Sequence, residues 1–330
     1  MTGEQLLELK NVSVYFPIRR FAAPTQYLNA LRDVSLSLAR GEILALVGES
    51  GSGKTTTAKV VAKLYRPTQG EVLFKGRDIF QQRGGDKEYK KSVQMIFQNP
   101  YEVLNPTHRI ESILERPFKI HGLATRREIR VKVEELLASV GLEPAEKYLP
   151  KFPHELSGGE RQRINIARAI SVEPELLLAD EPTSMLDVSI KMIIMNLLKR
   201  FREERNISLL YITHDLAGAK YLADRIAVLY AGMLVEMGPA RAVIHAAYHP
   251  YTQLLRAAAP QPEQGFRQGR LPAKGDIPSL INPPPGCRFH PRCPLAGPQC
   301  AREVPELEEV APGHLVRCLK LEEAKGGLAQ

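Results

Sequence analysis

Short apolar runs alternate with helix-like stretches along most of the chain. Ile43–Val47, Leu176–Ala179 and Ser208–Thr213 are apolar runs of strand length, which is typical of strands buried on both faces. A glycine-rich turn follows the first run, and after it comes a stretch of helical spacing from about Thr55 to Leu64. Buried strands that alternate with helices predict an α/β fold, with a mainly parallel sheet covered by helices.

A helical block interrupts this alternation between about residues 107 and 171. One helix in the block is predicted to begin at the capping-box sequence Thr125-Arg126-Arg127-Glu128 and to end near Gly141. A helical block inserted into an α/β core predicts a subdomain with a task of its own.

Proline usage changes near Pro260. Residues 260–330 contain 12 of the 25 prolines, in a chain of 330 residues that is long enough for about two domains. We therefore predict a compact domain over residues 1–259 and a loop-rich C-terminal extension over residues 260–330.

Composition narrows the class of protein only a little. The hydrophobic fraction of 44% and the charged fraction of 25% exclude a disordered, collagen-like or disulfide-scaffold chain. The formal net charge of +8 suits an acidic partner without selecting one. No apolar run approaches the ~20 residues that span a bilayer, and Met1–Glu4 does not resemble the start of a signal peptide. We therefore expect a cytoplasmic protein that can dock on a membrane protein.

The turn after the first buried strand carries a phosphate-binding motif. Its sequence matches G-x-x-x-x-G-K-[ST] between a strand and a helix, where backbone N–H groups can surround phosphate oxygens. Lys54 is expected to reach the β- and γ-phosphates, and Thr55 to offer its hydroxyl to Mg²⁺. The glycine spacing does not fit the G-x-G-x-x-G of a dinucleotide site. The predicted nucleotide-binding residues in this segment are Gly48, Glu49, Ser50, Gly51, Ser52, Gly53, Lys54, Thr55 and Thr56.

Two adjacent carboxylates follow the second buried strand. We expect Asp180 to hold Mg²⁺, directly or through water, and Glu181 to orient or deprotonate the attacking water. An acidic pair by itself is more often a turn or a helix cap. Phosphoryl transfer needs a metal ligand and a positioned nucleophile. In a chain that also carries a phosphate-binding motif, the pair therefore indicates a catalytic site.

The segment Leu156-Ser157-Gly158-Gly159-Glu160-Arg161-Gln162-Arg163 resembles the signature motif of ATP-binding cassette (ABC) ATPases. Ser157 and Glu160 predict a capping box, and the two glycines leave helix N-terminal amides open to an anion. The resemblance implies that Ser157, Gly158 and Gly159 bind the ATP held by a partner cassette. Glu160 stands where this family more often has Gln, and it adds negative charge near the γ-phosphate.

Further single residues match this family. The resemblance implies that Gln98 senses Mg²⁺ and the membrane partner, that His214 contacts the γ-phosphate, and that Asp187 is the D-loop aspartate. Phe16 is expected to stack on adenine, with Tyr15 as the alternative because strand neighbours face opposite ways. The predicted catalytic residues are Glu181, His214 and Gln98, and the predicted Mg²⁺ ligands are Thr55, Gln98 and Asp180.

Over nearly the whole chain, the resemblance narrows to the dipeptide, oligopeptide and nickel importers, especially the second of their two ATPase subunits. It is carried by Gln94–Tyr101, Leu104–Pro106, Glu181–Ser189, His249–Leu255 and Gly286–Pro294, with Met185 where a small residue is commoner. The implied fold is a P-loop NTPase ABC cassette with an inserted helical subdomain.

Several partners follow from the resemblance. They are a second ABC ATPase subunit, which we expect to be a related but distinct chain, two transmembrane permease subunits and, indirectly, an extracytoplasmic substrate-binding protein. Residues 99–106 are expected to receive a coupling helix of the membrane subunit. ATP binding is expected to close two cassettes head to tail, and hydrolysis to release them.

All the cysteines lie in the extension, at Cys287, Cys293, Cys300 and Cys318. A reducing compartment disfavours disulfides, so this clustering points to a metal. The spacing lacks the close pairs usual for structural zinc, and four thiolates suit a [4Fe–4S] cluster. The choice of iron–sulfur rests mainly on the resemblance, because importers of this group carry such a cluster on the same spacing, and zinc is the alternative. We expect a stabilising or regulatory role.

The resemblance implies an ATPase at the cytoplasmic face of the membrane that powers import of di- or oligopeptides. Nickel and oligosaccharides are alternative cargoes. A soluble ABC protein acting on nucleic acid or ribosomes is less favoured, because the chain has neither a second cassette nor a long coiled-coil insertion. A P-loop kinase has no use for the signature motif. The basic stretch around Arg126 and Arg130 lacks interleaved aromatic residues and predicts a solvated helix face, without nucleic-acid binding.

Overall fold

The structure, a computed structural model, describes residues 4–19, 24–81, 86–258 and 278–325. It has two compact units. Unit 1 comprises Met1–Ala39, Ile43–Gln81 and Tyr211–Gln330, and unit 2 comprises Arg40–Glu42 and Gln82–Leu210. The strand β8 (Ser208–Thr213) has residues in both units.

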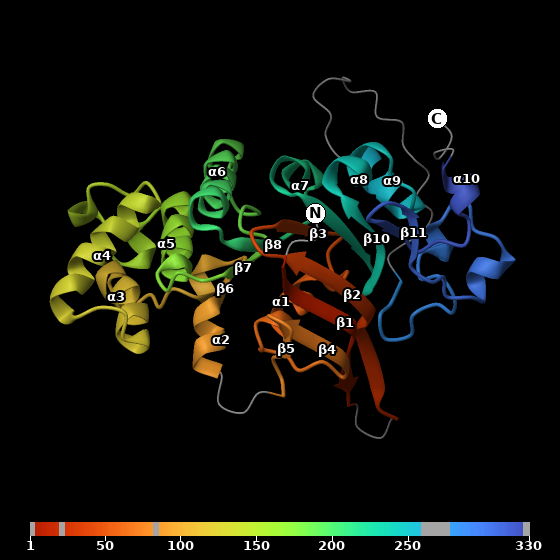
Figure 1. Cartoon of the computed structure of the whole chain (residues 1–330), viewed down its shortest axis with the longest axis horizontal. Helices are drawn as coiled ribbons and strands as arrows, with labels where there is room; N and C mark the ends of the chain where they lie inside the picture. The colour runs from red at the N-terminus through yellow and green to blue at the C-terminus, as the bar shows by residue number, and fades with distance from the viewer. Residues whose placement is uncertain (1–3, 20–23, 82–85, 259–277, 326–330) are drawn as a thin grey trace. The chain divides into compact units, whose positions relative to one another are not determined.

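Unit 1 contains an antiparallel sheet of order β2-β1-β4-β5 (Figure 1). Its strands are β1 (Gln5–Ile18), β2 (Gln26–Ala39), β4 (Gln69–Phe74) and β5 (Arg77–Asp78). The register between β1 and β2 shifts at several points, and Asn11 and Asp33 have φ angles of 51° and 50°. These irregularities interrupt the two-residue alternation along both strands, so the sequence pattern does not predict this sheet.

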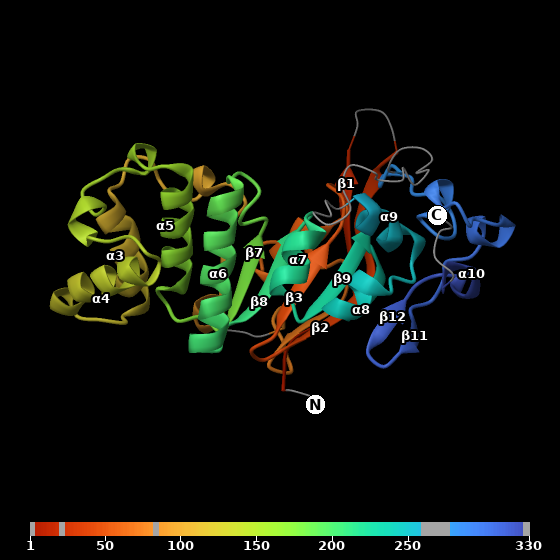
Figure 2. The same ribbon diagram turned by 90° about the horizontal axis from the view of Figure 1, so that it is seen from above.

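The other strands of unit 1 follow the order β11-β12-β10-β9-β3. Strand β3 pairs parallel to β9, whereas β10, β12 and β11 continue the sheet in antiparallel fashion. Figure 2 shows the C-terminal hairpin that β11 and β12 form. The strand bounds are β3 (Ile43–Val47), β9 (Arg225–Tyr230), β10 (Met233–Pro239), β11 (Glu308–Ala311) and β12 (His314–Val316).

A buried ionisable pair joins the C-terminal hairpin to this sheet. The side chain of Glu236 on β10 is fully buried, and it accepts backbone N–H groups of Tyr248 and His249 at 2.8 and 3.0 Å. His314 Nε2 lies 2.7 Å from Glu236 Oε1. A buried carboxylate needs hydrogen-bond partners. The C-terminal segment (residues 278–325) supplies one of them to Glu236, through His314.

The helices of unit 1 are short. Helix α1 directly follows the loop after β3, and Figure 2 labels α8 and α9 near β9. The bounds are α1 (Lys54–Val61), α7 (Leu216–Leu222), α8 (Ala240–His245), α9 (Pro250–Ala258) and α10 (Leu321–Lys325), with the 3-10 turns η4 (His290–Arg292) and η5 (Pro298–Ala301).

Unit 2 is mainly helical. Its helices α3, α4 and α5 pack against one another (Figure 1), and its strands β6 and β7 pair in parallel. The bounds are α2 (Asp86–Ser92), β6 (Val93–Ile96), α3 (Ile110–His121), α4 (Arg126–Ser139), α5 (Gly158–Ile170), β7 (Leu176–Asp180) and α6 (Val188–Arg205), with the 3-10 turns η1 (Pro100–Glu102), η2 (Ala145–Lys147) and η3 (Pro153–Glu155).

Amphipathic spacing explains the helices of unit 2. Helix α4 buries Ile129, Val133, Leu136 and Leu137, which recur along one face, and the predicted capping box at Thr125 and Glu128 is present. Glu128 accepts the Thr125 N–H at 2.7 Å.

Most predicted elements are confirmed. The three buried strands match β3, β7 and β8, and α4 ends at Ser139, close to its predicted end. The predicted helix from Thr55 to Leu64 is shorter than expected, because α1 ends at Val61 and Lys63 turns into the left-handed region with φ 57°. The boundary placed at Pro260 lies outside the described residues, so the division at that point stays a prediction.

Candidate nucleotide site and cysteine cluster

The phosphate loop (residues 48–55) connects β3 to α1 within unit 1. The Lys54 side chain is buried, and its Nζ donates to the backbone oxygens of Gly48 at 2.7 Å and Glu49 at 2.9 Å. The Ser52 N–H donates to the Glu49 oxygen at 3.2 Å. The loop therefore curls around its own lysine, which is the arrangement that a phosphate-binding motif requires.

At two glycines of the phosphate loop, a larger residue would clash with the backbone of another segment. Gly53 has a φ of 104°, and a Cβ atom there would lie 2.7 Å from the Ala30 backbone oxygen. At Gly48 a Cβ atom would lie 2.2 Å from the Leu229 backbone oxygen. Glycine is the residue that permits both the positive φ and the close backbone approach.

Polar groups of the loop remain available for an anion. Gly53 is the N-cap residue of α1, and no side chain caps the helix, so its first amides face the loop without a side-chain acceptor. Ser52 is buried, and its Oγ has no hydrogen-bond partner in the described part of the chain. Uncapped amides, a buried hydroxyl and Lys54 together suit a phosphate group.

Two other predicted nucleotide residues belong to unit 1. Phe16 on β1 is half-buried, and its ring packs edge-on against Tyr65 with the centroids 5.2 Å apart. His214 is exposed and directly follows β8. The next residue, Asp215, caps α7 by accepting the Ala217 N–H at 2.9 Å, which fixes the backbone beside His214.

The predicted acidic and glutamine residues belong to unit 2. Asp180 is the last residue of β7 and is buried, and Glu181 follows with a φ of 45°. Gln98 is exposed in the loop after β6, which pairs in parallel with β7 and places Ile96 beside Ala179. Because parallel strands end at the same edge of a sheet, the structure brings Gln98 to the edge that carries Asp180 and Glu181.

The predicted signature segment forms the start of α5. The capping box is confirmed, because Ser157 Oγ accepts the Glu160 N–H at 3.3 Å and Glu160 accepts the Ser157 N–H at 2.9 Å. The bond from the Ser157 N–H, together with one from the Ser157 hydroxyl, lowers the pKa of the Glu160 carboxyl. Ser157 and Gly158 are exposed, whereas a Cβ atom at Gly159 would lie 2.9 Å from Ile190. Two exposed residues thus begin a helix whose Gly159 lies close to Ile190 of α6.

The four cysteines gather within the C-terminal segment and form no disulfide. Burial, with a smaller contribution from the neighbouring cysteine thiols, raises the pKa of Cys293 to about 12 and that of Cys318 to about 11. The Lys320 N–H donates to Cys318 Sγ at 3.3 Å, and the N–H groups of Phe289 and Leu295 donate to Cys287 and Cys293. In each case the donor stands two residues after its cysteine.

In the part of the chain that the structure describes, no group of three or more His, Cys, Asp and Glu side chains is arranged to hold a metal ion.

One ion pair of the site could not be predicted from the sequence pattern. Arg292, next to Cys293, forms a two-point ion pair with Glu49 of the phosphate loop, with N–O distances of 2.7 and 3.1 Å. The two residues are separated by 243 positions. Opposite charge was the only available signal, and it does not select this pair among the many acidic and basic residues of the chain.

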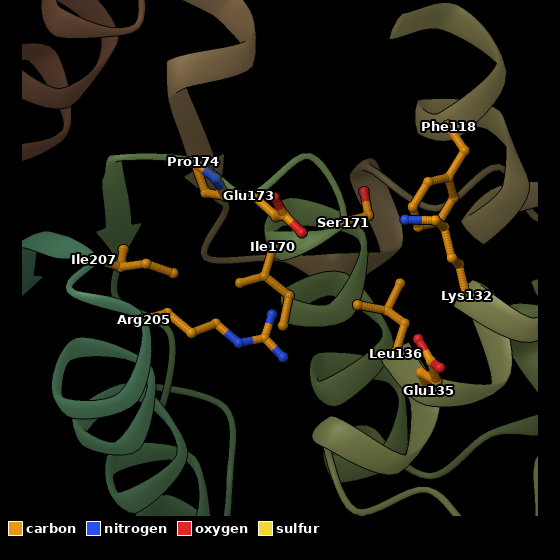
Figure 3. A pocket seen from close by; sticks show the side chains of 10 residues that line it. All are labelled: Phe118, Lys132, Glu135, Leu136, Ile170, Ser171, Glu173, Pro174, Arg205 and Ile207. Atoms are coloured by element: carbon orange, nitrogen blue, oxygen red, sulfur yellow. The ribbon is translucent and has the colours of Figure 1, made fainter. Parts of the chain in front are cut away.

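A separate pocket of about 370 Å³ lies within unit 2 (Figure 3). It is lined by Phe118, Lys132, Glu135, Leu136, Ile170, Ser171, Glu173, Pro174, Arg205 and Ile207. None of these residues belongs to the predicted nucleotide site, so the predicted chemistry does not use this pocket.

Comparisons with known proteins give one consistent result. The family model described as "ABC transporter" matches residues 31–184, and the one described as "Oligopeptide/dipeptide transporter, C-terminal region" matches residues 235–300. The oligopeptide transport ATP-binding protein AppF of Bacillus subtilis is 44% identical over 96% of this chain and 97% of its own. The probable peptide ABC transporter ATP-binding protein y4tS of Sinorhizobium fredii is 40% identical over 96% of this chain and 90% of its own.

Solved structures agree with these relatives. A dimeric, post-hydrolysis state of the ATP-binding cassette MJ0796 bound to ADP and Pi is 31% identical, with a TM-score of 0.62 over 72% of this chain and 99% of that chain. Among the described residues, no helix is long and apolar enough to cross a membrane. The chain therefore belongs to the ATP-hydrolysing subunits of ABC transporters, in the family of oligopeptide and dipeptide importers.

Proposed function

We propose that the chain hydrolyses ATP to power the import of di- or oligopeptides. The observation that carries this proposal is the 44% identity to an oligopeptide transport ATP-binding protein over 96% of the chain. The match of residues 235–300 to the C-terminal region of oligopeptide and dipeptide transporters supports the same cargo class. Nickel and oligosaccharide cargoes are the alternatives.

In this proposal the phosphate loop binds the triphosphate. Lys54 leaves its two backbone acceptors to contact the β- and γ-phosphates, and the amides of Gly51 to Thr56 surround phosphate oxygens. The buried Ser52 hydroxyl and the uncapped start of α1 support this assignment. Phe16 stacks on the adenine ring, which its half-exposed position on β1 allows.

Hydrolysis is assigned to the residues at the ends of β6, β7 and β8. We assign Mg²⁺ to Asp180, Gln98 and Thr55, whose carboxylate, amide and hydroxyl oxygens are the donors that Mg²⁺ prefers. Glu181 orients and deprotonates the attacking water, and His214 contacts the γ-phosphate. Ser157, Gly158 and Gly159 serve the ATP of a partner cassette.

The substitution Glu181→Gln tests these roles. It removes the proton acceptor but keeps the shape of the side chain, so we expect ATP turnover to fall by at least about 100-fold while ATP binding persists. Size-exclusion chromatography with ATP should then show an accumulated cassette dimer. Loss of ATP binding in E181Q would contradict the assigned role of Glu181.

The proposal also covers the partners of the chain, which family membership alone does not specify. We propose a related, distinct second cassette, two transmembrane permease subunits and a position at the cytoplasmic face of the membrane. Tyr101 is 61% exposed, and its ring lies 3.6 Å from the Arg161 guanidinium of α5. This exposed aromatic supports residues 99–106 as the place where a permease docks. Copurification with the permeases, lost in Tyr101→Ala, would test it.

We also propose that the four cysteines ligate a [4Fe–4S] cluster. They fit such a group in two respects. Backbone N–H groups donate to three of the sulfurs, as expected around cluster thiolates. The buried thiols also raise one another's pKa, which shows that they are neighbours, as the ligands of one cluster must be. When bound, the cluster would supply the positive charge that allows buried thiolates to exist.

Anaerobic purification tests the cluster. A visible band near ~400 nm, together with about four irons and four sulfides per chain, is expected. One zinc ion per chain and no colour would contradict the cluster and leave the ATPase assignment in place.

A further inference from the structure

Glu49 attaches the phosphate loop to the C-terminal segment. Its carboxylate accepts hydrogen bonds from both terminal nitrogens of Arg292. Its backbone N–H donates to the Tyr251 hydroxyl at 2.8 Å. Its backbone oxygen accepts Lys54 Nζ. The Ser52 N–H donates to the same oxygen, so four different groups hold Glu49, and two of them lie more than 200 residues away in the sequence.

Packing fixes the two distant groups. Tyr251 is buried and lies against Tyr230 and Phe289, with ring centroids 4.6 and 5.5 Å away. The Tyr230 hydroxyl lies 3.4 Å from Arg292 Nη1. The Arg292 side chain is only 10% exposed, and that of Glu49 is 29% exposed. A partly buried, two-point pair of this kind holds a fixed geometry better than a surface ion pair does.

The backbone of Arg292 belongs to the cysteine loop (residues 287–293). Within this loop the Arg292 N–H donates to the Phe289 oxygen at 3.0 Å, and the Cys293 N–H donates to the His290 oxygen at 3.2 Å. The same turn thus carries two of the cysteines and the arginine that holds Glu49. A change in the shape of the cysteine loop would move the Arg292 guanidinium.

Glu49 presents an electrostatic problem for a loop that binds phosphate. A carboxylate close to a triphosphate repels it, unless a cation holds the carboxylate and neutralises its charge. Arg292 does both in this structure. We propose that Arg292 is a positioning residue for ATP, which orients and neutralises Glu49 and thereby makes nucleotide affinity depend on the folded cysteine loop. This inference rests on the proposed ATP site.

The first test compares nucleotide affinity between two glutamine variants of the C-terminal segment. Arg292→Gln should weaken binding of a fluorescent ATP analogue about tenfold, the size expected for losing a charge-assisted, two-point pair. Arg317→Gln is the matched control. Arg317 is also buried in this segment, but its partners are Asp33 and the oxygens of Leu234 and Pro305. Its substitution should leave the affinity within about twofold of that of the wild type.

A double-mutant cycle separates this role from a merely structural one. If Arg292 acts through Glu49, adding R292Q to Glu49→Gln should cost little further affinity, because the amide carries no charge to neutralise. Losses in R292Q and E49Q that simply add would overturn the proposal. Arg292→Lys, which keeps the charge but not the two-point geometry, should lie between the wild type and R292Q, even if R292Q folds poorly.

Thermodynamic linkage provides a further test that does not require ATP hydrolysis to be measured. If the cysteine loop raises nucleotide affinity, nucleotide must stabilise the cysteine loop by the same factor. ADP should therefore slow hydrogen exchange in peptides covering residues 287–300 of the wild type, and not in R292Q. Equal affinities of the wild type and R292Q, or no protection by ADP, would overturn this inference alone. A wild-type chain that binds no nucleotide would instead contradict the proposed function.

Discussion

The phosphate loop and the cysteine loop are both short, irregular segments of unit 1, but different forces hold them. The phosphate loop is shaped mainly by its own glycines and by bonds from Lys54 and Ser52 to oxygens within the loop, and distant side chains hold it at Glu49. The cysteine loop depends on side chains that reach distant elements. Arg288 donates to the Ala231 oxygen, and Phe289 packs against Tyr230.

This difference separates local from long-range determination. The conformation of a loop shaped by its own backbone depends on consecutive residues, so a short sequence motif can identify it. A loop held by distant side chains needs the whole unit to fold first. Substitutions should therefore affect the two loops in different ways.

The largest expected effect is on the phosphate loop alone. Lys54→Ala removes the only side-chain cation of this motif and should weaken ATP binding by at least about 100-fold. The iron content expected from the proposed [4Fe–4S] cluster should not change. Lys59→Ala, on the same helix but outside the loop, is the control. A K54A protein that lost its iron as well would show that the two loops are less independent than we describe.

The converse variant replaces all four cysteines with serine. We expect complete loss of iron and a fall of several degrees in the thermal midpoint, because ligand binding to the folded state contributes to its stability. ATP should still bind, although more weakly, since the phosphate loop keeps its own backbone bonds. Unchanged folding and unchanged binding to partner subunits would refute a stabilising role for the cysteine cluster.

Two glycines of the phosphate loop provide a sharper test of local shape. At Gly53 an alanine would meet the Ala30 oxygen at 2.7 Å, whereas at Gly51, with φ 78°, a Cβ atom meets nothing within 4 Å. Gly51→Ala should cost about 1–2 kcal/mol of backbone strain, and Gly53→Ala should cost more and weaken ATP binding as well. Urea unfolding and ATP titration measure both. Equal effects would mean that the contact with Ala30 relaxes easily.

The last expected effect concerns pH and develops only as the solution becomes acidic. Burial lowers the pKa of His249 to about 4, with nearby Glu236 opposing the shift, and its ring lies 5.6 Å from Phe289 of the cysteine loop. Because the unfolded chain binds this proton more readily, stability should fall as the pH drops from about 6.5 towards 4, by at most about 1.4 kcal/mol for each unit of pKa difference.

His249→Gln should remove this part of the pH dependence, as measured by thermal unfolding at pH 7 and pH 5. His245→Gln is the control, because His245 is exposed at the end of α8. If the two variants showed the same pH slope, burial of His249 would not be its source.

Much of unit 2 and the centre of unit 1 could be predicted from the sequence. The strands β3, β7 and β8 are continuous apolar runs, and the capping boxes at Thr125 and Ser157 mark where α4 and α5 begin. The antiparallel sheet was missed because Asn11 and Asp33 interrupt the alternation of β1 and β2. The hairpin β11–β12 was missed because its strands are only four and three residues long.

The sequence by itself specified the phosphate loop, the acidic pair and the signature helix, together with the chemistry that we propose for them. Each depends on residues close together in the chain, whose backbone geometry limits which side chains are possible. Only the tertiary structure decided that Arg292 of the cysteine loop holds Glu49 of the phosphate loop, and that His314 and Tyr248 satisfy the buried Glu236. Such pairs depend on a fold that brings distant residues together, and single-residue chemistry does not specify which of many possible partners will meet.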